Sequence, residues 1–243
     1  ALAGLVSTVA GHAFITDPKP RMPGDAFKAA CGAQMYSNQN SDVYGNIQGE
    51  LQVAQADYNA EECDIWLCKG FKYDDNTANV QSFTAGQNVS ITVDIRAPHG
   101  GPANVSIVDT ATNTVIGEPL ISWQLYGSTS QPIQADQENF SVTIPSTLGS
   151  KCSTAGACVI QWFWDSASIN QTYESCIDFT VGGSGSDTPT PASSAAPSSS
   201  AAAATSVAAE ATSPAASATP TPTPTEVVEI PTSTAAPATP SAT

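Results

Sequence analysis

The sequence is poor in positive charge. Only seven of its 243 residues are Lys or Arg, all at or before Lys151, against 22 acidic residues, and the formal net charge is −15. Nucleic acids and anionic membrane surfaces are bound largely through Lys and Arg, so the charge argues against both as partners. No apolar run is long enough to span a bilayer as a helix, and we expect no transmembrane segment. These absences indicate an acidic protein, which we expect to be a monomer.

Histidine is scarce too, and no two cysteines have the C-x-x-C spacing of a zinc site. The chain has two histidines and six cysteines. It also has four N-x-S/T sequons, at Asn88, Asn104, Asn139 and Asn170. An even number of cysteines together with sequons is typical of the oxidising secretory route. We therefore expect a secreted, extracellular glycoprotein whose cysteines form disulfides.

Beyond Val181 the chain lacks aromatic and basic residues. Residues 182–243 are rich in Ser, Thr, Pro and Ala, and such a composition cannot bury enough apolar surface to offset the entropy of ordering it. We expect a disordered tail that is O-glycosylated. Its one apolar patch, residues 226–230, is too short for a membrane anchor. The alternative to a chain that ends in this tail is a further module after Thr243.

The first eleven residues, ALAGLVSTVAG, predict the end of a secretory signal peptide. An apolar run is followed by small residues, with Val9 and Gly11 at positions −3 and −1 of a cut before His12. Cleavage there would make His12 the first residue of the mature protein. The alternative is an ordinary apolar first strand.

Residues 12–181 predict one domain of antiparallel strands, because several segments alternate apolar and polar residues or are continuously apolar. These segments are residues 88–97, 103–117, 138–145, 158–165 and 175–181. Strands at this spacing, separated by Gly, Pro and Asn turns, favour an all-β, two-sheet sandwich of the immunoglobulin or fibronectin kind. Between Pro18 and Asp75 we expect long loops with a helical turn or two, around residues 25–35 and 64–70.

The two histidines suggest a metal site when they are taken together. His99 lies in a PHGGP turn after an alternating strand, where a lone histidine is usually solvated. A mature amino-terminal His12 would offer its α-amine and a ring nitrogen, and His99 would supply a third nitrogen. Three neutral nitrogen donors in a plane suit copper, the strongest binder of the divalent series. An uncleaved Gly11 would abolish this site by converting the amine to an amide.

Three motifs resemble those of lytic polysaccharide monooxygenases. The segment HAFITDPKPR resembles the start of these enzymes, most closely the fungal members and the related group named chitin-binding type 4. PHGGP resembles the segment that carries their second copper histidine, and QTYESC, residues 171–176, resembles their Q-x-Y-x-x-C segment. The motifs follow the family's order across nearly the whole domain.

The resemblance implies a copper enzyme that oxidises a polysaccharide such as chitin or cellulose. His12 and His99 would bind one copper ion, with Tyr173 as the axial residue. Gln171, on the same strand face as Tyr173, would donate a hydrogen bond to oxygen species, so both are candidate catalytic residues. An external electron donor and peroxide or dioxygen would take part, and hydroxylation at C1 or C4 of a sugar ring would break the glycosidic bond.

The resemblance also implies a disulfide that holds the strand of Tyr173. The expected disulfides are Cys31–Cys63, Cys68–Cys176 and Cys152–Cys158. Two features depart from the family: Phe163 is a rival axial residue, and Asn170 begins a sequon directly before Gln171. Because a glycan at Asn170 would crowd the metal, we expect this sequon to be unused.

Two other interpretations remain beside the oxidative enzyme. One is a secreted copper-binding protein without oxidative activity; known offshoots of the fold place an acidic residue at the metal, which none of the three motifs suggests here. The other is a metal-free, cell-wall glycan-binding module on a glycosylated stalk. The aromatic residues that could stack on sugar rings are Tyr36, Tyr44, Trp66, Phe71, Tyr73, Trp123 and Tyr126.

Overall fold

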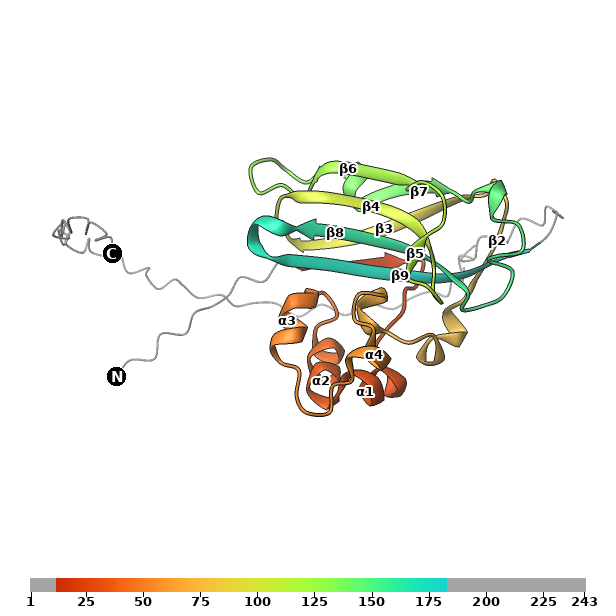
Figure 1. Ribbon diagram of the computed structural model, residues 1–243. Coiled ribbons are helices and arrows are strands. Elements are labelled where there is room, and N and C mark those ends of the chain that lie inside the picture. The colour runs from red at the N-terminus through yellow and green to blue at the C-terminus, as the bar shows by residue number, and fades with distance from the viewer. Residues whose placement is uncertain (1–11, 183–243) are drawn as a thin grey trace, which may run out of the picture. The chain divides into compact units, whose positions relative to one another are not determined.

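The computed structural model describes residues 12–182, which contain two β-sheets and a group of short helices (Figure 1). The strands are β1 (His12–Asp17), β2 (Gln81–Thr84), β3 (Asn88–Ala97), β4 (Gly101–Asp109), β5 (Thr114–Val115), β6 (Ile121–Tyr126), β7 (Asn139–Thr143), β8 (Cys158–Ser166) and β9 (Gln171–Gly182). The predicted signal segment, residues 1–11, and the predicted tail from residue 183 onward lie outside the described residues.

The strands form the predicted two-sheet sandwich. The smaller sheet has the order β1-β3-β7, and the larger has the order β2-β9-β8-β4-β5, with β6 also paired to β4. Within residues 12–182 all pairs are antiparallel except β2 with β9. In Figure 1 the larger sheet faces the viewer and the smaller sheet lies behind it. The all-β fold class is confirmed, although the sequence did not predict β1, β2 or β6.

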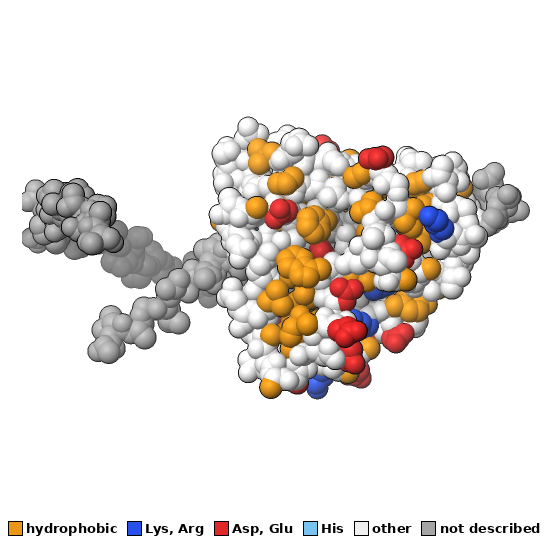
Figure 2. Space-filling view, in the orientation of Figure 1, with side chains coloured by type: hydrophobic (Ala, Val, Ile, Leu, Met, Phe, Trp, Pro, Cys, Tyr) orange, Lys and Arg blue, Asp and Glu red, His pale blue; other side chains and the backbone are white. Residues whose placement is uncertain are grey.

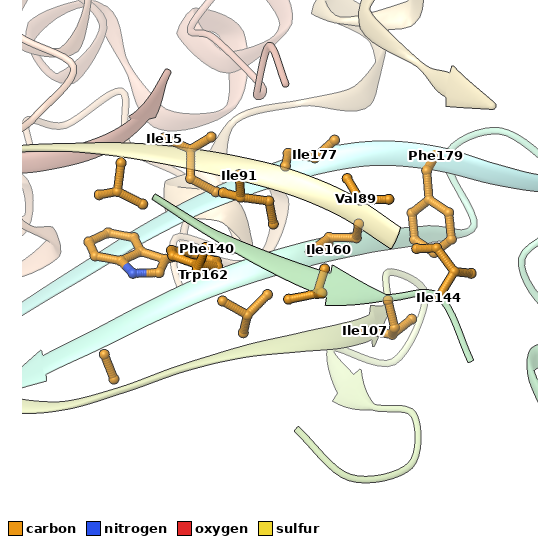
Figure 3. Packing of buried hydrophobic residues seen from close by; sticks show 14 of the residues in the cluster. Ile15, Val89, Ile91, Ile107, Phe140, Ile144, Ile160, Trp162, Ile177 and Phe179 are labelled. Carbon is orange, nitrogen blue, oxygen red and sulfur yellow. The ribbon is translucent and has the colours of Figure 1, made fainter. Parts of the chain in front are cut away.

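The main core fills the space between the two sheets. Alternate residues of β3 and β7 are buried, as their patterns predicted, while β8 and β9 are buried along most of their length. Figure 3 shows Ile91 and Phe140 of the smaller sheet pointing into the space occupied by Ile160 and Trp162 of the larger. Burial of these side chains from both sheets makes the sandwich stable.

The segment between Pro18 and Asp75 is more helical than expected. It contains α1 (Asp25–Cys31), α2 (Ala33–Ser41), α3 (Ile47–Gln52), α4 (Ala60–Cys63) and the 3₁₀ helices η1 (Cys68–Gly70) and η2 (Tyr73–Asp75). Elsewhere lie α5 (Ala135–Glu138), η3 (Thr77–Asn79), η4 (Ser146–Leu148) and η5 (Ala167–Ile169). No helix within residues 12–182 is long and apolar enough to cross a membrane.

These helices depend on contacts from distant parts of the chain. The Asp75 carboxylate accepts hydrogen bonds from the amides of Ala26 and Phe27, both at 2.9 Å, and so caps α1 in place of its N-cap glycine. A second apolar cluster, which includes Phe27 and Met35, packs α1 and α2 against Phe14 of β1. Ala13 and Ile15 face the sandwich core instead, so β1 contributes to both cores.

On the side that carries the larger sheet, basic side chains are fewer than acidic or apolar ones. In Figure 2 apolar side chains (orange) gather near the middle of this face, with acidic side chains (red) beside them and sparse basic ones (blue). This distribution agrees with the low content of Lys and Arg.

Candidate metal centre

Strand pairing brings the two histidines to the same end of the sandwich. His12 is the first residue of β1 and lies opposite Ala97, the last residue of β3. His99 follows two residues later, in the connection from β3 to β4. The sequence could not show this proximity, because it depends on the register between two strands that are far apart in the chain.

His99 presents an imidazole nitrogen with no protein partner. Its Nε2 atom is buried and makes no hydrogen bond within the described structure. Burial lowers the pKa of His99, and the neighbouring His12 lowers it further, so the ring is neutral at physiological pH. A buried nitrogen that lacks a partner needs an explanation, and a neutral imidazole is the form that binds metals.

His12 is held by a carboxylate that the sequence analysis missed. Its Nε2 atom lies 2.9 Å from Oδ2 of Asp42, and the two side chains are 25% and 47% exposed. Asp42 is the C-cap residue that directly follows α2. It lies in the segment NSDVYGN, where nothing in the local pattern distinguishes it from an ordinary turn residue; only the packing of α2 beside β1 reveals it.

Tyr173 and Gln171 lie on one face of β9, as the period of a strand requires. The Tyr173 hydroxyl donates a hydrogen bond to Oε1 of Gln171 at 2.5 Å. The Tyr173 ring is fully buried and stacks on Trp164, with ring centroids 4.9 Å apart. Burial raises the pKa of Tyr173 above its usual value, so the phenol keeps its proton. The bond orients Gln171 and leaves its amide nitrogen as the group that can donate.

The hairpin between β8 and β9 carries Gln171 to the same end as His99. Ser166, which pairs with Gln171, donates a hydrogen bond from Oγ to the carbonyl oxygen of His99 at 3.2 Å. On the other side, Gln48 of α3 exchanges two hydrogen bonds with Thr172, at 2.7 and 2.8 Å. The hairpin and α3 lie at one end of the molecule in Figure 1. The structure therefore brings His12, His99 and the start of β9 to this end.

The structure places Phe163 and Tyr173, the two candidate axial residues, on opposite faces of the larger sheet. Trp162 and Trp164, the neighbours of Phe163, are both buried in the sandwich core, so Phe163 points to the opposite face of the sheet. It pairs with Glu174, whereas Trp164 pairs with Tyr173. Alternation along β8 therefore excludes Phe163 from the face that Tyr173 occupies.

Most of the aromatic candidates for sugar stacking lie in the protein interior. Tyr44, Phe71 and Tyr126 are buried, and Trp123 packs against the main core. Trp66 is 46% exposed. Composition alone could not separate buried rings from exposed ones.

A hollow of about 280 Å³ adjoins His12. Its walls are His12, Asn38, Ser41, Asp42, Gly45, Asn46, Gly49 and Glu50. Apart from His12, these residues belong to α2, α3 and the loop between them, so this helical segment forms one side of the site.

The structure contains the three disulfides Cys31–Cys63, Cys68–Cys176 and Cys152–Cys158. These are the expected pairs, and the family resemblance had implied only that Cys176 bonds to a cysteine of the loop region. The Cys68–Cys176 bond links η1 to β9 three residues after Tyr173. It therefore ties the strand of Tyr173 and Gln171 to the helical segment.

Within residues 12–182 no three His, Cys, Asp or Glu side chains are grouped so as to hold a metal ion. The two imidazoles alone are too few for a tight site. The predicted cleavage before His12 would add its α-amine as a third nitrogen.

Residues 12–179 match the family of lytic polysaccharide mono-oxygenases, described as cellulose-degrading, and the chain belongs to this family. The match begins at His12, the residue that the sequence predicts to be the mature amino terminus. A comparison with curated proteins finds no match.

Several solved structures are similar to this chain. A CBM33 protein of Bacillus amyloliquefaciens, in complex with Cu(I), is 19% identical with a TM-score of 0.29, covering 42% of this chain and 56% of that one. A lytic polysaccharide monooxygenase of Streptomyces lividans is 18% identical with a TM-score of 0.30, covering 42% and 58%. The catalytic domain of one from Listeria monocytogenes is 14% identical with a TM-score of 0.39, covering 70% and 99%. The match thus spans little more than half the length of the first two.

Proposed function

We propose that this protein is a secreted, copper-dependent lytic polysaccharide monooxygenase. Its copper ligands would be the α-amine and ring of His12 and the ring of His99. The observation that carries the proposal is the buried Nε2 atom of His99, which has no partner among the described residues and lies at the end of the sandwich where β1 begins with His12.

The donor set fits copper better than zinc. Structural zinc sites use four Cys or His ligands, and catalytic ones use three side chains, whereas the described chain offers two histidines and no free cysteine. Two imidazoles and one amine make the nitrogen-rich set that favours copper. The lowered pKa of His99 keeps its ring neutral, which removes the cost of displacing a proton on metal binding.

When bound, copper would activate peroxide or dioxygen, with electrons from an external donor. The activated oxidant would hydroxylate C1 or C4 of a sugar ring. The chain's own part is to position groups around it. Tyr173, protonated and held between Trp164 and Gln171, would line the copper site. Gln171 would orient oxygen species with its amide nitrogen.

The substrate face would be formed by residues beside the two histidines. Leu125 is 51% exposed and contacts the position of Gly100, and Ile169 is 43% exposed, two residues before Gln171. These apolar side chains would pack against the sugar rings of chitin or cellulose. An extended polymer is a suitable substrate because both of these side chains are exposed.

The remaining sequence predictions belong to the same proposal. The first eleven residues would be a signal peptide. The predicted tail would be O-glycosylated; its first residue, Gly182, is the last residue of β9. Asn88 and Asn139 are exposed and would accept N-glycans, whereas Asn170 would stay unmodified beside Gln171.

The proposal is tested on protein secreted from a eukaryotic host. Intact mass after deglycosylation should show a chain that begins at His12, and one equivalent of copper should give a tetragonal, nitrogen-rich Cu(II) paramagnetic resonance spectrum. With a reductant, the protein should release oxidised oligosaccharides from chitin or cellulose, and His99→Ala should not. A chain that retains Gly11, or binds no copper, contradicts the proposal.

The contact between Asp42 and His12 favours a second candidate, a copper-binding protein without oxidative activity. Tight copper binding without oxidised products on either polysaccharide, with reductant and peroxide present, would support this function over the enzyme.

A further inference from the structure

We propose that Asp42 is a positioning residue that selects which ring nitrogen of His12 binds copper. The inference rests on the proposed function, since it assumes that His12 is the amino-terminal ligand. Its structural basis is the 2.9 Å contact between Oδ2 of Asp42 and Nε2 of His12.

The Asp42 carboxylate is fixed through both oxygens. While Oδ2 faces His12, Oδ1 accepts a hydrogen bond from the backbone amide of Tyr44 at 3.1 Å. The backbone amide of Asp42 itself donates to the carbonyl of Asn38 at 2.8 Å, at the end of α2. These bonds leave the carboxylate little freedom to rotate away from His12.

The loop that carries Asp42 is also tied to the strand that leads to His99. The Tyr44 hydroxyl donates to Oδ2 of Asp94 on β3 at 2.9 Å, and the Arg96 guanidinium lies 3.5 Å from the Tyr44 ring centroid. On the interior side, Nζ of Lys69 donates to the carbonyl oxygen of Val43 at 2.5 Å. The same loop is therefore held against β3, whose end sets the position of the second imidazole.

The chemistry of the contact determines the tautomer of His12. An ionised carboxylate can only accept hydrogen bonds, so the Nε2 atom that faces it must carry a proton. In the neutral ring the lone pair then lies on Nδ1. Only Nδ1 is close enough to the backbone to bind the same metal ion as the α-amine of its own residue.

The same geometry places Asp42 behind the ring and not at the metal. The two ring nitrogens point to opposite sides of the imidazole, so a carboxylate that accepts from Nε2 cannot ligate an ion bound at Nδ1. Asp42 would act as the outer partner of a ligating histidine, an arrangement that fixes ring orientation and raises ligand basicity.

Replacement of Asp42 by asparagine gives the sharpest test. The amide of Tyr44 requires an oxygen acceptor, so Oδ1 of the new side chain should stay in place and its NH₂ group should face His12. Nε2 of His12 would then have to accept a hydrogen bond from this NH₂ group, and the ring proton would move to Nδ1. Asp42→Asn should therefore reverse the tautomer while keeping the shape of the loop.

The tautomer is read directly in the metal-free chain from His12 to Thr243. Long-range proton–nitrogen spectra of the imidazoles are simple here, because the sequence has only two histidines and His99 serves as an internal reference. We expect the Nε2–H form of His12 in the wild type, the Nδ1–H form in Asp42→Asn and a mixture in Asp42→Ala. Asp74→Asn, which changes an exposed carboxylate on η2, should match the wild type.

Copper binding gives the second measurement. The dissociation constant for Cu(II), by calorimetry against a competing chelator, should rise about 10- to 100-fold in Asp42→Asn, the usual effect of removing an outer partner. The control Asp74→Asn should leave it unchanged. Thermal unfolding of the metal-free variants checks that each is folded.

The outcomes separate the inference from the function beneath it. If the wild type binds copper but Asp42→Asn changes neither the tautomer nor the affinity, the role of Asp42 is overturned and the proposed function stands. If the copper spectrum of Asp42→Ala shows the loss of an oxygen ligand together with a nitrogen ligand, Asp42 itself binds the metal. That result also overturns the inference. A wild type that binds no copper overturns the proposed function, and the inference with it.

Discussion

His99 offers the clearest separation between folding and metal binding at the scale of single residues. Its buried Nε2 atom makes no hydrogen bond within residues 12–182, so its loss removes no bond that stabilises the fold. We expect His99→Ala to weaken Cu(II) binding by more than about 100-fold. The substitution removes a ligand itself, which costs more than removing only the outer partner of a ligand.

The stability of metal-free His99→Ala should change by less than about 1 kcal/mol. Calorimetry with copper and urea unfolding without it measure the two effects separately. A large loss of stability with normal copper affinity would show that His99 is a structural residue.

Tyr173 combines a packing role with a polar one, and two substitutions separate them. Tyr173→Phe keeps the ring that stacks on Trp164 and removes only the hydroxyl that bonds to Gln171. It should lower the free energy of unfolding by about 1 kcal/mol. Tyr173→Ala should lower it by about 3–5 kcal/mol, because it also opens a cavity in the core. Urea denaturation at neutral pH measures both; equal losses would contradict this division.

At the scale of elements, one buried ion pair connects the amino-terminal segment to β9. Arg21 forms two bonds with the carboxylate of Asp178, at 2.7 and 2.8 Å, and both side chains are at most 5% exposed. Its third bond goes to the carbonyl oxygen of Phe71. The arginine of the opening motif therefore joins β1 and the helical segment to the larger sheet.

Loss of Arg21 should be strongly destabilising. Arg21→Ala leaves the Asp178 carboxylate buried without its partner, and we expect a loss of about 3–5 kcal/mol in unfolding free energy. Arg96→Ala, which breaks the exposed pair with Asp94, is the control and should have little effect because solvent screens it. Similar losses in the two variants, by urea denaturation, would contradict the assigned role of burial.

The disulfides should differ in their contributions because they close loops of different length. Cys68–Cys176 spans 108 residues and Cys152–Cys158 spans six. In the chain-entropy model, the first contributes about 5 kcal/mol and the second about 2 kcal/mol. Paired Cys→Ala variants, compared by urea denaturation, should preserve this order; the reverse order would contradict it.

At the scale of the whole molecule, Lys69 lies where the helical segment meets the larger sheet. Its side chain is buried over the rings of Phe14 and Phe71, and its backbone amide donates to Glu174 of β9. Burial lowers the pKa of Lys69 to about 7, an effect that the carboxylates of Glu50, Asp42 and Glu174 oppose. Stability should therefore depend on pH through this residue.

The direction of this dependence follows from proton binding. Above about pH 7 the folded state has released the Lys69 proton, while the unfolded state holds it up to its ordinary pKa of 10.5. The Lys69 contribution to unfolding free energy should thus rise between these limits, by at most about 1.4 kcal/mol per pH unit. Urea unfolding at pH 7, 8 and 9 should show the difference between wild type and Lys69→Met grow with pH; Lys28→Met, at an exposed site, should show no such trend.

Much of the fold could be predicted from local pattern. The alternation of β3 and β7 and the apolar runs of β8 and β9 act over a few residues, so they are visible in the sequence. The helices between Pro18 and Asp75 were underestimated because their supports are remote. Asp75 caps α1 from 49 positions away, and no local signal replaces that contact.

The sequence by itself determined the chemistry that is available. It limits the chain to two histidines, predicts a cleavage site directly before one of them, and puts Gln171 and Tyr173 two residues apart on a strand. Those features depend on composition and near-neighbour spacing, which the chain carries before it folds.

Only the tertiary structure decided how these groups meet. The register of β1 with β3 brings His12 near His99, the alternation of β8 removes Phe163 from the face of Tyr173, and the packing of α2 brings Asp42 to His12. Each depends on contacts between segments that are distant in the chain. Such contacts arise when the two apolar cores form, because burial selects one register and one face for every strand.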